Sequence, residues 1–353
     1  MSESDLARFG WTPERETEFS HHRATGLVPA RVAVEHRSAY VLYAEGGEIR
    51  AELAGRLRHE GVEPAVGDWV ALRQPSTIAA VLPRRTVFSR KEPWAPAVEQ
   101  VLAANADTVW ITTALTERDF KPRRLERYLA TAWESGADPV IVLTKRDLWP
   151  DVEGAVLEAE AIAFGVPVHA VSGVTGEGVD ELRSYFGGNR TVALLGSSGV
   201  GKSTLVNRLA GHEVLETQEI RADGRGRHTT THRELVPLPG GGLVLDTPGL
   251  RELQLWDVGE GLDNAFEDVG ALATRCRFSD CGHKSEPGCA VRAALRAGTL
   301  TRDRFESWRK LQRELERLER RLDARARSEY GKEMRKQARR RRQTQRPPRR
   351  RTR

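Results

Sequence analysis

Hydrophobic and polar positions alternate in short runs between residues 28 and 92. Alternation with a period of two is typical of strands that bury one face, and turn residues such as Gly46, Gly47 and Pro64 separate the runs. We expect strands over residues 31–35, 39–44, 49–53, 68–72 and 78–82. Short strands at this spacing predict a small β-barrel over residues 28–92. The OB-fold is the preferred interpretation, and an SH3-like barrel fits almost as well.

A second pattern begins near residue 101, where apolar runs alternate with amphipathic helical stretches. This alternation is typical of a parallel sheet covered by helices on both faces. It predicts an α/β domain over residues 98–257. The expected strands are 108–113, 140–144, 166–171, 192–195 and 243–246, and the expected helices lie near 122–135, 153–164, 178–186 and 202–210.

The remaining segments have patterns of their own. Residues 1–27 are polar without sustained periodicity and predict a flexible extension. A long charged helix is expected over residues 302–327, within a helical domain spanning 258–328. Its apolar stripe recurs at spacings of three and four and comprises Phe305, Trp308, Leu311, Leu315, Leu318 and Leu322. We expect the stripe to pack on its own domain, with a short coiled-coil contact as the alternative.

The charge is distributed unevenly along the chain. Of the 353 residues, 331–353 carry twelve Lys or Arg and one Glu, so this end has a net charge of +11 although the whole chain has only +6. A tail this rich in arginine, spanning 329–353, is expected to be disordered when free and to contact nucleic-acid phosphates; a merely solubilising tail is the alternative. No apolar run reaches 18 residues and no secretory signal pattern begins the chain, so we expect a cytoplasmic protein without a membrane partner.

Residues 196–203 read Gly-Ser-Ser-Gly-Val-Gly-Lys-Ser between an expected strand and an expected helix. This order suits a phosphate-binding loop, because the glycines let backbone N–H groups converge on the phosphates and the helix amino terminus adds positive potential. We expect Lys202 to bridge the β- and γ-phosphates, Ser203 to bind Mg²⁺ and Thr204 to lie near the α-phosphate. Downstream, at 246–249, Asp246 would hold Mg²⁺ through water and the Gly249 amide would sense the γ-phosphate.

The run Thr144-Lys145-Arg146-Asp147 indicates guanine. The Asp147 carboxylate can accept both the N1 and the N2 hydrogens of guanine, whereas adenine presents an acceptor at N1 and would be repelled. Lys145 would cover the base, and backbone amides at Ser172 and Gly173 would contact O6. Most GTPases have asparagine where this chain has Thr144, so the contact to the purine O6 and N7 edge is left open.

The guanine-reading run lies about fifty residues before the phosphate loop, the reverse of the order in an ordinary P-loop GTPase. This reversal predicts a circularly permuted domain. Rotation is tolerable because all the ligand loops lie at the carboxyl ends of parallel strands. The residues expected to contact the nucleotide are Thr144, Lys145, Arg146, Asp147, Ser172, Gly173, Gly196, Ser197, Ser198, Gly199, Val200, Gly201, Lys202, Ser203, Thr204, Asp246 and Gly249.

Hydrolysis needs a group that orients water, and many GTPases use a glutamine at the position that Leu250 occupies here. An aliphatic side chain cannot do this, so we expect a low intrinsic rate that a partner stimulates. The glycine-rich run 224–232 lies where the first switch belongs. Beside Lys202, we expect Thr230 to bind Mg²⁺ and His228 to position the water, with an ordinary surface histidine as the alternative.

All three cysteines of the chain, Cys276, Cys281 and Cys289, lie within fourteen residues, and His283 stands between the second and third. An odd number argues against a disulfide framework. Three thiolates and one imidazole suit tetrahedral Zn²⁺, in a structural site with no open position. Three buried free thiols are the alternative.

Taken together, these motifs resemble the RsgA (YjeQ/YloQ) family of ribosome small-subunit-dependent GTPases, from about residue 28 to residue 310. The resemblance implies a monomer that hydrolyses GTP when the 30S subunit stimulates it, with an OB-fold and a zinc domain that contact 16S rRNA during late small-subunit maturation. A nearly inert nucleotide switch that binds RNA, or a permuted GTPase serving another RNA or protein partner, is the competing hypothesis.

Overall fold

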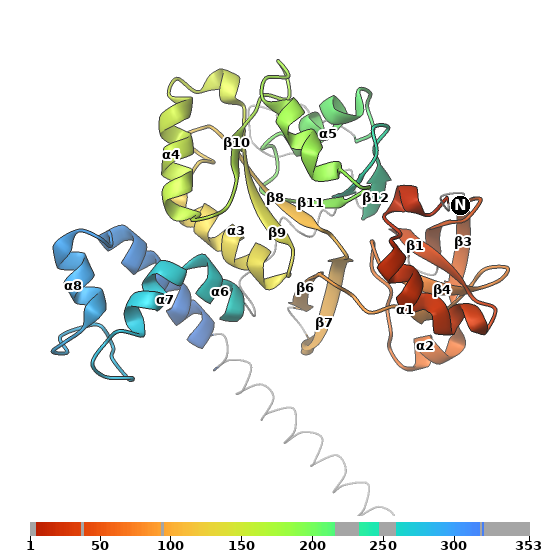
Figure 1. Ribbon diagram of the computed structural model, residues 1–353, viewed down its shortest axis with the longest axis horizontal. Coiled ribbons are helices and arrows are strands. Elements are labelled where there is room, and N and C mark those ends of the chain that lie inside the picture. Colours follow the sequence, from red (N-terminus) through yellow and green to blue (C-terminus); the bar gives the residue numbers. More distant parts are fainter. Residues whose placement is uncertain are drawn as a thin grey trace, which may run out of the picture.

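The computed structural model describes residues 5–36, 39–92, 95–215, 233–246, 259–317 and residue 320. A β-barrel, an α/β domain and a helical domain follow one another along the chain (Figure 1). Within the described residues, no helix is long and apolar enough to cross a membrane. The expected tail over residues 329–353 and the stripe residues Leu318 and Leu322 lie outside the described residues.

All five strands expected for the barrel are confirmed, as β1 (Val28–Glu35), β2 (Tyr40–Ala44), β3 (Gly47–Leu53), β4 (Trp69–Arg73) and β5 (Thr77–Val81). They pair in the order β1-β2-β3-β5-β4, and β4 returns to pair with β1. Only the β3–β5 pair is parallel, and the short helix α2 (Gly55–His59) lies between β3 and β4. This closed order identifies the barrel as an OB-fold rather than an SH3-like barrel.

The expectation of a flexible extension over residues 1–27 is wrong for the described part, residues 5–27. A short 3₁₀ helix, η1 (Ala7–Phe9), precedes helix α1 (Pro13–Ala24), which Thr12 caps by accepting a hydrogen bond from the backbone N–H of Arg15 at 3.3 Å. Phe9 stacks on Tyr43 of the barrel, with ring centroids 4.4 Å apart, and Phe19 is fully buried. The segment is ordered because its scattered apolar side chains pack on the barrel.

A buried arginine joins this segment to the two domains beside it. Arg31 of β1 is 2% exposed and donates hydrogen bonds to the carbonyl oxygens of Phe9, Gly67 and Asn105. Its guanidinium also lies over the ring of Trp69, 5.3 Å from the centroid. Burial lowers the pKa of Arg31 to about 10, which still leaves it charged near neutral pH. One side chain therefore contacts the amino-terminal segment, the barrel and the start of the α/β domain.

The sheet of the α/β domain has the order β10-β9-β8-β11-β13-β12. All its strands are parallel except β12, which pairs antiparallel with β13. The strands are β8 (Thr108–Ala114), β9 (Asp138–Thr144), β10 (Val168–Ala170), β11 (Thr191–Leu195), β12 (Glu234–Pro237) and β13 (Leu243–Asp246). The expected strands are confirmed, and β12 is an additional one.

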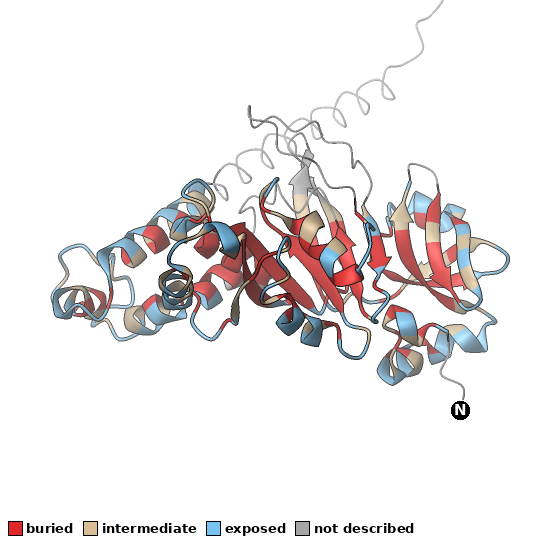
Figure 2. Ribbon diagram, turned by 90° about the horizontal axis from the view of Figure 1, so that it is seen from above, coloured by how far each residue is buried: buried red, intermediate tan, exposed pale blue. Residues whose placement is uncertain are grey.

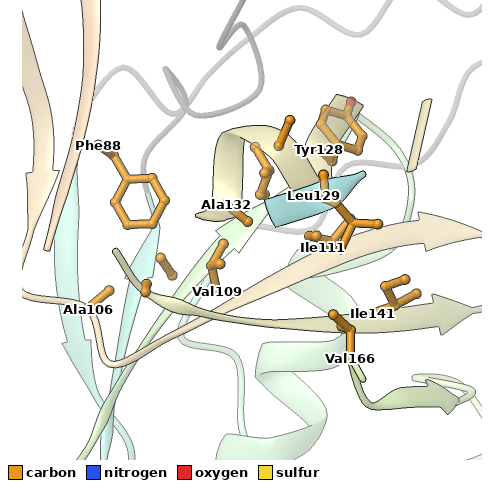
Figure 3. Close-up of a cluster of buried hydrophobic side chains, with 14 of the residues drawn as sticks. Phe88, Ala106, Val109, Ile111, Tyr128, Leu129, Ala132, Ile141 and Val166 are labelled. Carbon is orange, nitrogen blue, oxygen red and sulfur yellow. The ribbon is translucent and has the colours of Figure 1, made fainter. Parts of the chain in front are cut away.

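Helices cover both faces of this sheet, as the alternating pattern predicts. Val109 and Ile111 of β8 pack in the cluster that includes Leu129 of helix α3 (Figure 3), whereas Trp110 packs on the opposite face with Leu205 of helix α5. Figure 2 shows the buried residues concentrated in the strands. The helices are α3 (Pro122–Glu134), α4 (Val152–Ile162) and α5 (Lys202–Ala210), and the segment η3 (Val179–Phe186) is a 3₁₀ helix.

The barrel and the sheet are continuous, because β12 pairs antiparallel with β1 at Val34 and Glu234. The hydroxyl of Tyr43 reinforces this junction by donating to the carbonyl oxygen of Leu235 at 3.0 Å. A hairpin that the sequence pattern did not predict, β6 (Val87–Glu92) and β7 (Ala95–Ala104), links the two domains along the chain. Its Phe88 is only 1% exposed and lies in the apolar cluster of Figure 3, so this aromatic ring supports the core.

The carboxyl-terminal domain contains α6 (Gly259–Ala265), α7 (Glu267–Ala273), α8 (Ala290–Ala297) and a helix over residues 302–317. Phe305, Trp308 and Leu311 of the expected apolar stripe are buried. They share a cluster with Phe266 and Val291 of the same domain, so the described part of the stripe packs as expected.

Candidate nucleotide site and metal centre

The phosphate-loop sequence lies between β11 and α5, at the carboxyl end of a central strand. Gly196 has φ 153°, and a Cβ at this position would lie 2.1 Å from the carbonyl oxygen of Thr112, so only glycine allows the loop to pass β8 this closely. The Lys202 ammonium donates to the carbonyl oxygens of Gly196 at 2.8 Å and Ser197 at 2.7 Å. The loop therefore curls around a lysine that is 6% exposed.

The loop after β9 contacts the phosphate loop directly. Thr144, the last residue of β9, is 2% exposed, and its hydroxyl donates to the carbonyl oxygen of Val200 and lies 3.2 Å from that of Thr113. A Cβ on Gly201 would lie 3.7 Å from the same hydroxyl oxygen. Although Thr144 and Val200 are 56 positions apart, the predicted guanine-reading run and the predicted phosphate loop are neighbours.

The loop after β10, which carries Ser172 and Gly173, lies beside the same phosphate loop. Ser172 is fully buried and its hydroxyl accepts from the backbone N–H of Thr175 at 3.1 Å. A Cβ on Gly173 would lie 3.1 Å from Cγ2 of Thr204 in α5. The loops that carry Asp147, Ser172 and Lys202 therefore meet at one edge of the sheet, which is where ligands bind in open α/β folds.

Arg146 holds two of these loops together, a role that the sequence did not indicate. Its guanidinium pairs with Oε1 of Glu177 at 2.7 Å and donates to the carbonyl oxygen of Ala170 at 3.1 Å. Lys145 adopts the left-handed conformation, with φ 59°, and the chain then turns into a 3₁₀ segment. Asp147 within that segment is exposed.

Two of the three expected Mg²⁺ ligands, Ser203 and Asp246, lie within the described residues. Asp246 is the last residue of β13 and is 6% exposed, and β13 is the parallel neighbour of β11. Its carboxylate therefore comes from the strand end beside the phosphate loop, where Ser203 lies in the first turn of α5. The expected residues His228, Thr230 and Gly249, together with Leu250, lie outside the described residues.

Tyr128 of α3 also reaches the phosphate loop, which the sequence did not indicate. Its hydroxyl lies 3.2 Å from Oγ of Ser197, and the two hydroxyls share a hydrogen bond. Within the apolar cluster of Figure 3, Tyr128 lies at the edge, with its oxygen directed away from the labelled aliphatic side chains.

The four predicted metal ligands gather at one point of the carboxyl-terminal domain. The ligand atoms of Cys276, Cys281, His283 and Cys289 all lie within 4.8 Å of one another. Nδ1 of His283 lies 3.6 Å from Sγ of Cys276 and 3.5 Å from Sγ of Cys289, and these two sulfurs are 3.9 Å apart. Tetrahedral Zn²⁺ would require about 3.6 Å between nitrogen and sulfur and about 3.8 Å between sulfurs, so the residues fit such an ion.

The electrostatics of His283 and Cys276 favour the forms that bind a metal, whereas burial raises the pKa of Cys281 to about 11, and a coordinated metal ion deprotonates such a thiol. Burial lowers the pKa of His283, which favours the neutral imidazole that a metal ion needs. Burial alone would raise the pKa of Cys276, but hydrogen bonds from the backbone of Val291 and Ala290, together with those to the other two cysteines, lower that pKa. The His283 ring lies 5.7 Å from the ring of Trp308, between centroids, so the cluster rests on the helix over residues 302–317.

Comparisons with known proteins agree with this geometry. A family model described as RsgA GTPase matches residues 81–256. The small ribosomal subunit biogenesis GTPase RsgA of Opitutus terrae is 51% identical over 328 residues, which cover 88% of this chain and 89% of that protein. The protein of the same name from Streptomyces coelicolor is 45% identical over 320 residues, or 88% of this chain and 87% of the relative.

Two solved structures share the fold. YjeQ from Thermotoga maritima superposes with a TM-score of 0.64 at 28% identity, over 82% of this chain and 98% of that one. YloQ, described as a circularly permuted GTPase, gives a TM-score of 0.57 at 22% identity, over 82% of this chain and 95% of that one. The second likeness bears on the fold alone.

Proposed function

The chain belongs to the RsgA family of small ribosomal subunit biogenesis GTPases, and from this premise we propose that it binds GTP among the three loops described above and hydrolyses it on the maturing 30S subunit. One observation carries the proposal for the site: the contact of Thr144 with Val200, which brings the guanine-reading run against the phosphate loop.

In this site Asp147 accepts the N1 and N2 hydrogens of guanine, the stem of Lys145 covers the base, and the backbone of Ser172 and Gly173 donates to O6. The Thr144 hydroxyl is engaged with the phosphate loop. We therefore propose that this hydroxyl holds the guanine-reading run against the phosphate loop. The O6 edge of the purine is then contacted by the backbone of Ser172 and Gly173.

At the other end of the nucleotide, Lys202 neutralises the β- and γ-phosphates, and backbone N–H groups of residues 197–203 donate to the phosphate oxygens. Ser203 and Asp246 would hold Mg²⁺, with Thr230 as a further ligand. The ion, when bound, supplies positive charge to the phosphate oxygens on which negative charge develops. Gly249 completes this end by sensing the γ-phosphate.

The 30S subunit stimulates hydrolysis in this proposal, because Leu250 cannot orient the attacking water. His228 is our candidate for that task once the subunit is bound. The observation that supports partner stimulation is the aliphatic residue at the position where many GTPases carry glutamine.

The three thiolates and one imidazole would hold one Zn²⁺ with a structural role. A metal at this point fixes the loop between α7 and α8, which has few buried side chains of its own. Exposed Arg277 lies over the ring of Phe278, 5.5 Å from its centroid, and Phe278 is itself 42% exposed. A basic residue beside an exposed aromatic ring suits RNA, and we propose that this domain, the OB-fold barrel and the arginine-rich tail contact 16S rRNA.

We further propose a cytoplasmic monomer with no membrane partner. Release of phosphate from GTP, measured with and without purified 30S subunits, tests the function. We expect a low basal rate and a large stimulation by 30S subunits. Binding to the subunit that depends on GTP but leaves turnover unchanged would favour the alternative, a nucleotide switch with little hydrolysis, and stimulation by a non-ribosomal RNA alone would favour a different partner.

A further inference from the structure

Helix α3 touches the phosphate loop at one point. The hydroxyls of Tyr128 and Ser197 lie 3.2 Å apart, and Tyr128 is 9% exposed. The ring belongs to the apolar cluster that holds α3 on the sheet, so its hydroxyl has a fixed position. A tyrosine has few rotatable bonds, which makes this contact well suited to restrain the loop.

Two positions earlier on the same helix, Glu126 contacts the carboxyl-terminal domain. Its Oε1 pairs with Nη1 of Arg304 at 2.9 Å, and its other oxygen accepts from the hydroxyl of Ser307. Glu126 and Arg304 have side chains only 3% and 10% exposed. Since successive residues of a helix are separated by about 100°, Glu126 and Tyr128 project to opposite sides of α3.

Further contacts make α3 and the carboxyl-terminal domain pack as one body. The backbone N–H of Gly261 in α6 donates to Oε2 of Glu134 at 2.9 Å, and a Cβ on Gly261 would lie 2.1 Å from the carbonyl oxygen of Ala130. Within the carboxyl-terminal domain, Arg304 also donates to the carbonyl oxygen of Ala265 in α6 at 2.6 Å, so the residue that pairs with Glu126 is itself fixed. The helices therefore lie too close to slide past one another without breaking buried contacts.

We propose that Tyr128 is a positioning residue for the phosphate loop, and that α3 transmits the state of that loop to the carboxyl-terminal domain through Glu126 and Arg304. The proposal rests on the proposed GTP site and adds a regulatory connection to it. This connection runs through the body of helix α3. Because coupling is reciprocal, the domain that bears the metal ligands also influences nucleotide affinity.

The test compares Tyr128→Phe, Ser197→Ala and the double variant for GTP affinity, turnover and hydrogen exchange. Each single variant should weaken GTP binding by about three- to tenfold, the effect of one hydrogen bond. The double variant should bind GTP no more weakly than the single variant with the lower affinity, because the two substitutions remove the same hydrogen bond. In Tyr128→Phe the KM should rise while kcat stays near that of the wild type, whereas a merely structural lesion would lower kcat by reducing the active fraction.

Hydrogen exchange tests the transmission. In the wild type, a saturating non-hydrolysable GTP analogue should change exchange of backbone amides in residues 302–317, and in Tyr128→Phe this change should shrink at equal saturation. Tyr185→Phe is the matched control, because the Tyr185 hydroxyl lies 2.8 Å from Nε2 of His169, outside the three loops. This control should match the wild type in every readout.

Additive effects of the two single variants, or an exchange response that Tyr128→Phe leaves intact, would overturn the inference while leaving the proposed GTP site standing. If the wild type binds GTP but hydrogen exchange in residues 302–317 does not change, the proposed transmission from the phosphate loop to the carboxyl-terminal domain is also wrong. If the wild type does not bind GTP, the proposed site is wrong and the inference falls with it.

Discussion

The hydroxyl of Thr144 donates a hydrogen bond to the carbonyl oxygen of Val200, which joins the loop after β9 to the loop after β11. The two residues are far apart in the chain, yet their strands end at the same edge of the sheet. The contact explains how a domain with rotated chain order can still assemble one nucleotide site, since the site depends on where strands end and not on their order.

Thr144→Val should weaken GTP binding, because valine keeps the shape of threonine but leaves the buried Val200 carbonyl without this donor. The cost of such a loss is about 1–3 kcal/mol, or roughly five- to 150-fold in the dissociation constant. Fluorescence titration with a labelled guanine nucleotide measures the change. Thr144→Ser keeps the hydroxyl and should stay near the wild type; equal affinities for all three proteins would remove Thr144 from the site.

Arg31→Met should lower the thermal stability of the whole chain, because three backbone carbonyls that Arg31 now satisfies would lose their donor. A loss of about 2–4 kcal/mol is expected for a buried, charge-assisted network. Calorimetry gives the change in Tm. The same substitution at exposed Arg50 on β3 is the control and should have almost no effect. A similar Tm for both variants would show that the junction does not depend on Arg31.

Arg304→Ala should destabilise the chain by about 3–5 kcal/mol, because it leaves the carboxylate of Glu126 buried and unpaired. The exposed pair of Arg320 with Glu316 provides a comparison, and Arg320→Ala should cost less than about 1 kcal/mol. Urea unfolding measures both. Should the two variants unfold at the same urea concentration, the interface between α3 and the carboxyl-terminal domain would contribute little.

Removal of the metal should unfold the loop between α7 and α8 and weaken the packing of the 302–317 helix. Elemental analysis of the purified chain should find one zinc per molecule, and Cys281→Ser should lower that content and the Tm together. Lys284→Gln changes an exposed residue in the same loop without removing a ligand, so it should retain zinc. Full zinc content in Cys281→Ser would contradict the assignment of this ligand.

Local patterns in the sequence predicted the structural features that are determined by residues close together in the chain. The barrel strands follow a simple alternation, and all four metal ligands lie within fourteen positions, so both were predictable. The ordered structure of residues 5–27 was not predictable from the sequence. Phe9 and Phe19 are spaced for contacts with the barrel, and their spacing shows no helical period. Nothing in the sequence pairs Tyr128 with Ser197, 69 positions apart, or Arg304 with Glu126, 178 positions apart.

The most direct test of the central claim, that loops separated in the rotated chain form one guanine nucleotide site, is the binding of GTP and xanthosine triphosphate to Asp147→Asn. Xanthine has a carbonyl where guanine has the N2 amino group, so an asparagine amide can donate to xanthine but cannot accept both guanine hydrogens. We predict that the variant loses GTP affinity by about a hundredfold or more and gains affinity for xanthosine triphosphate. Unchanged preference for GTP in Asp147→Asn would contradict it.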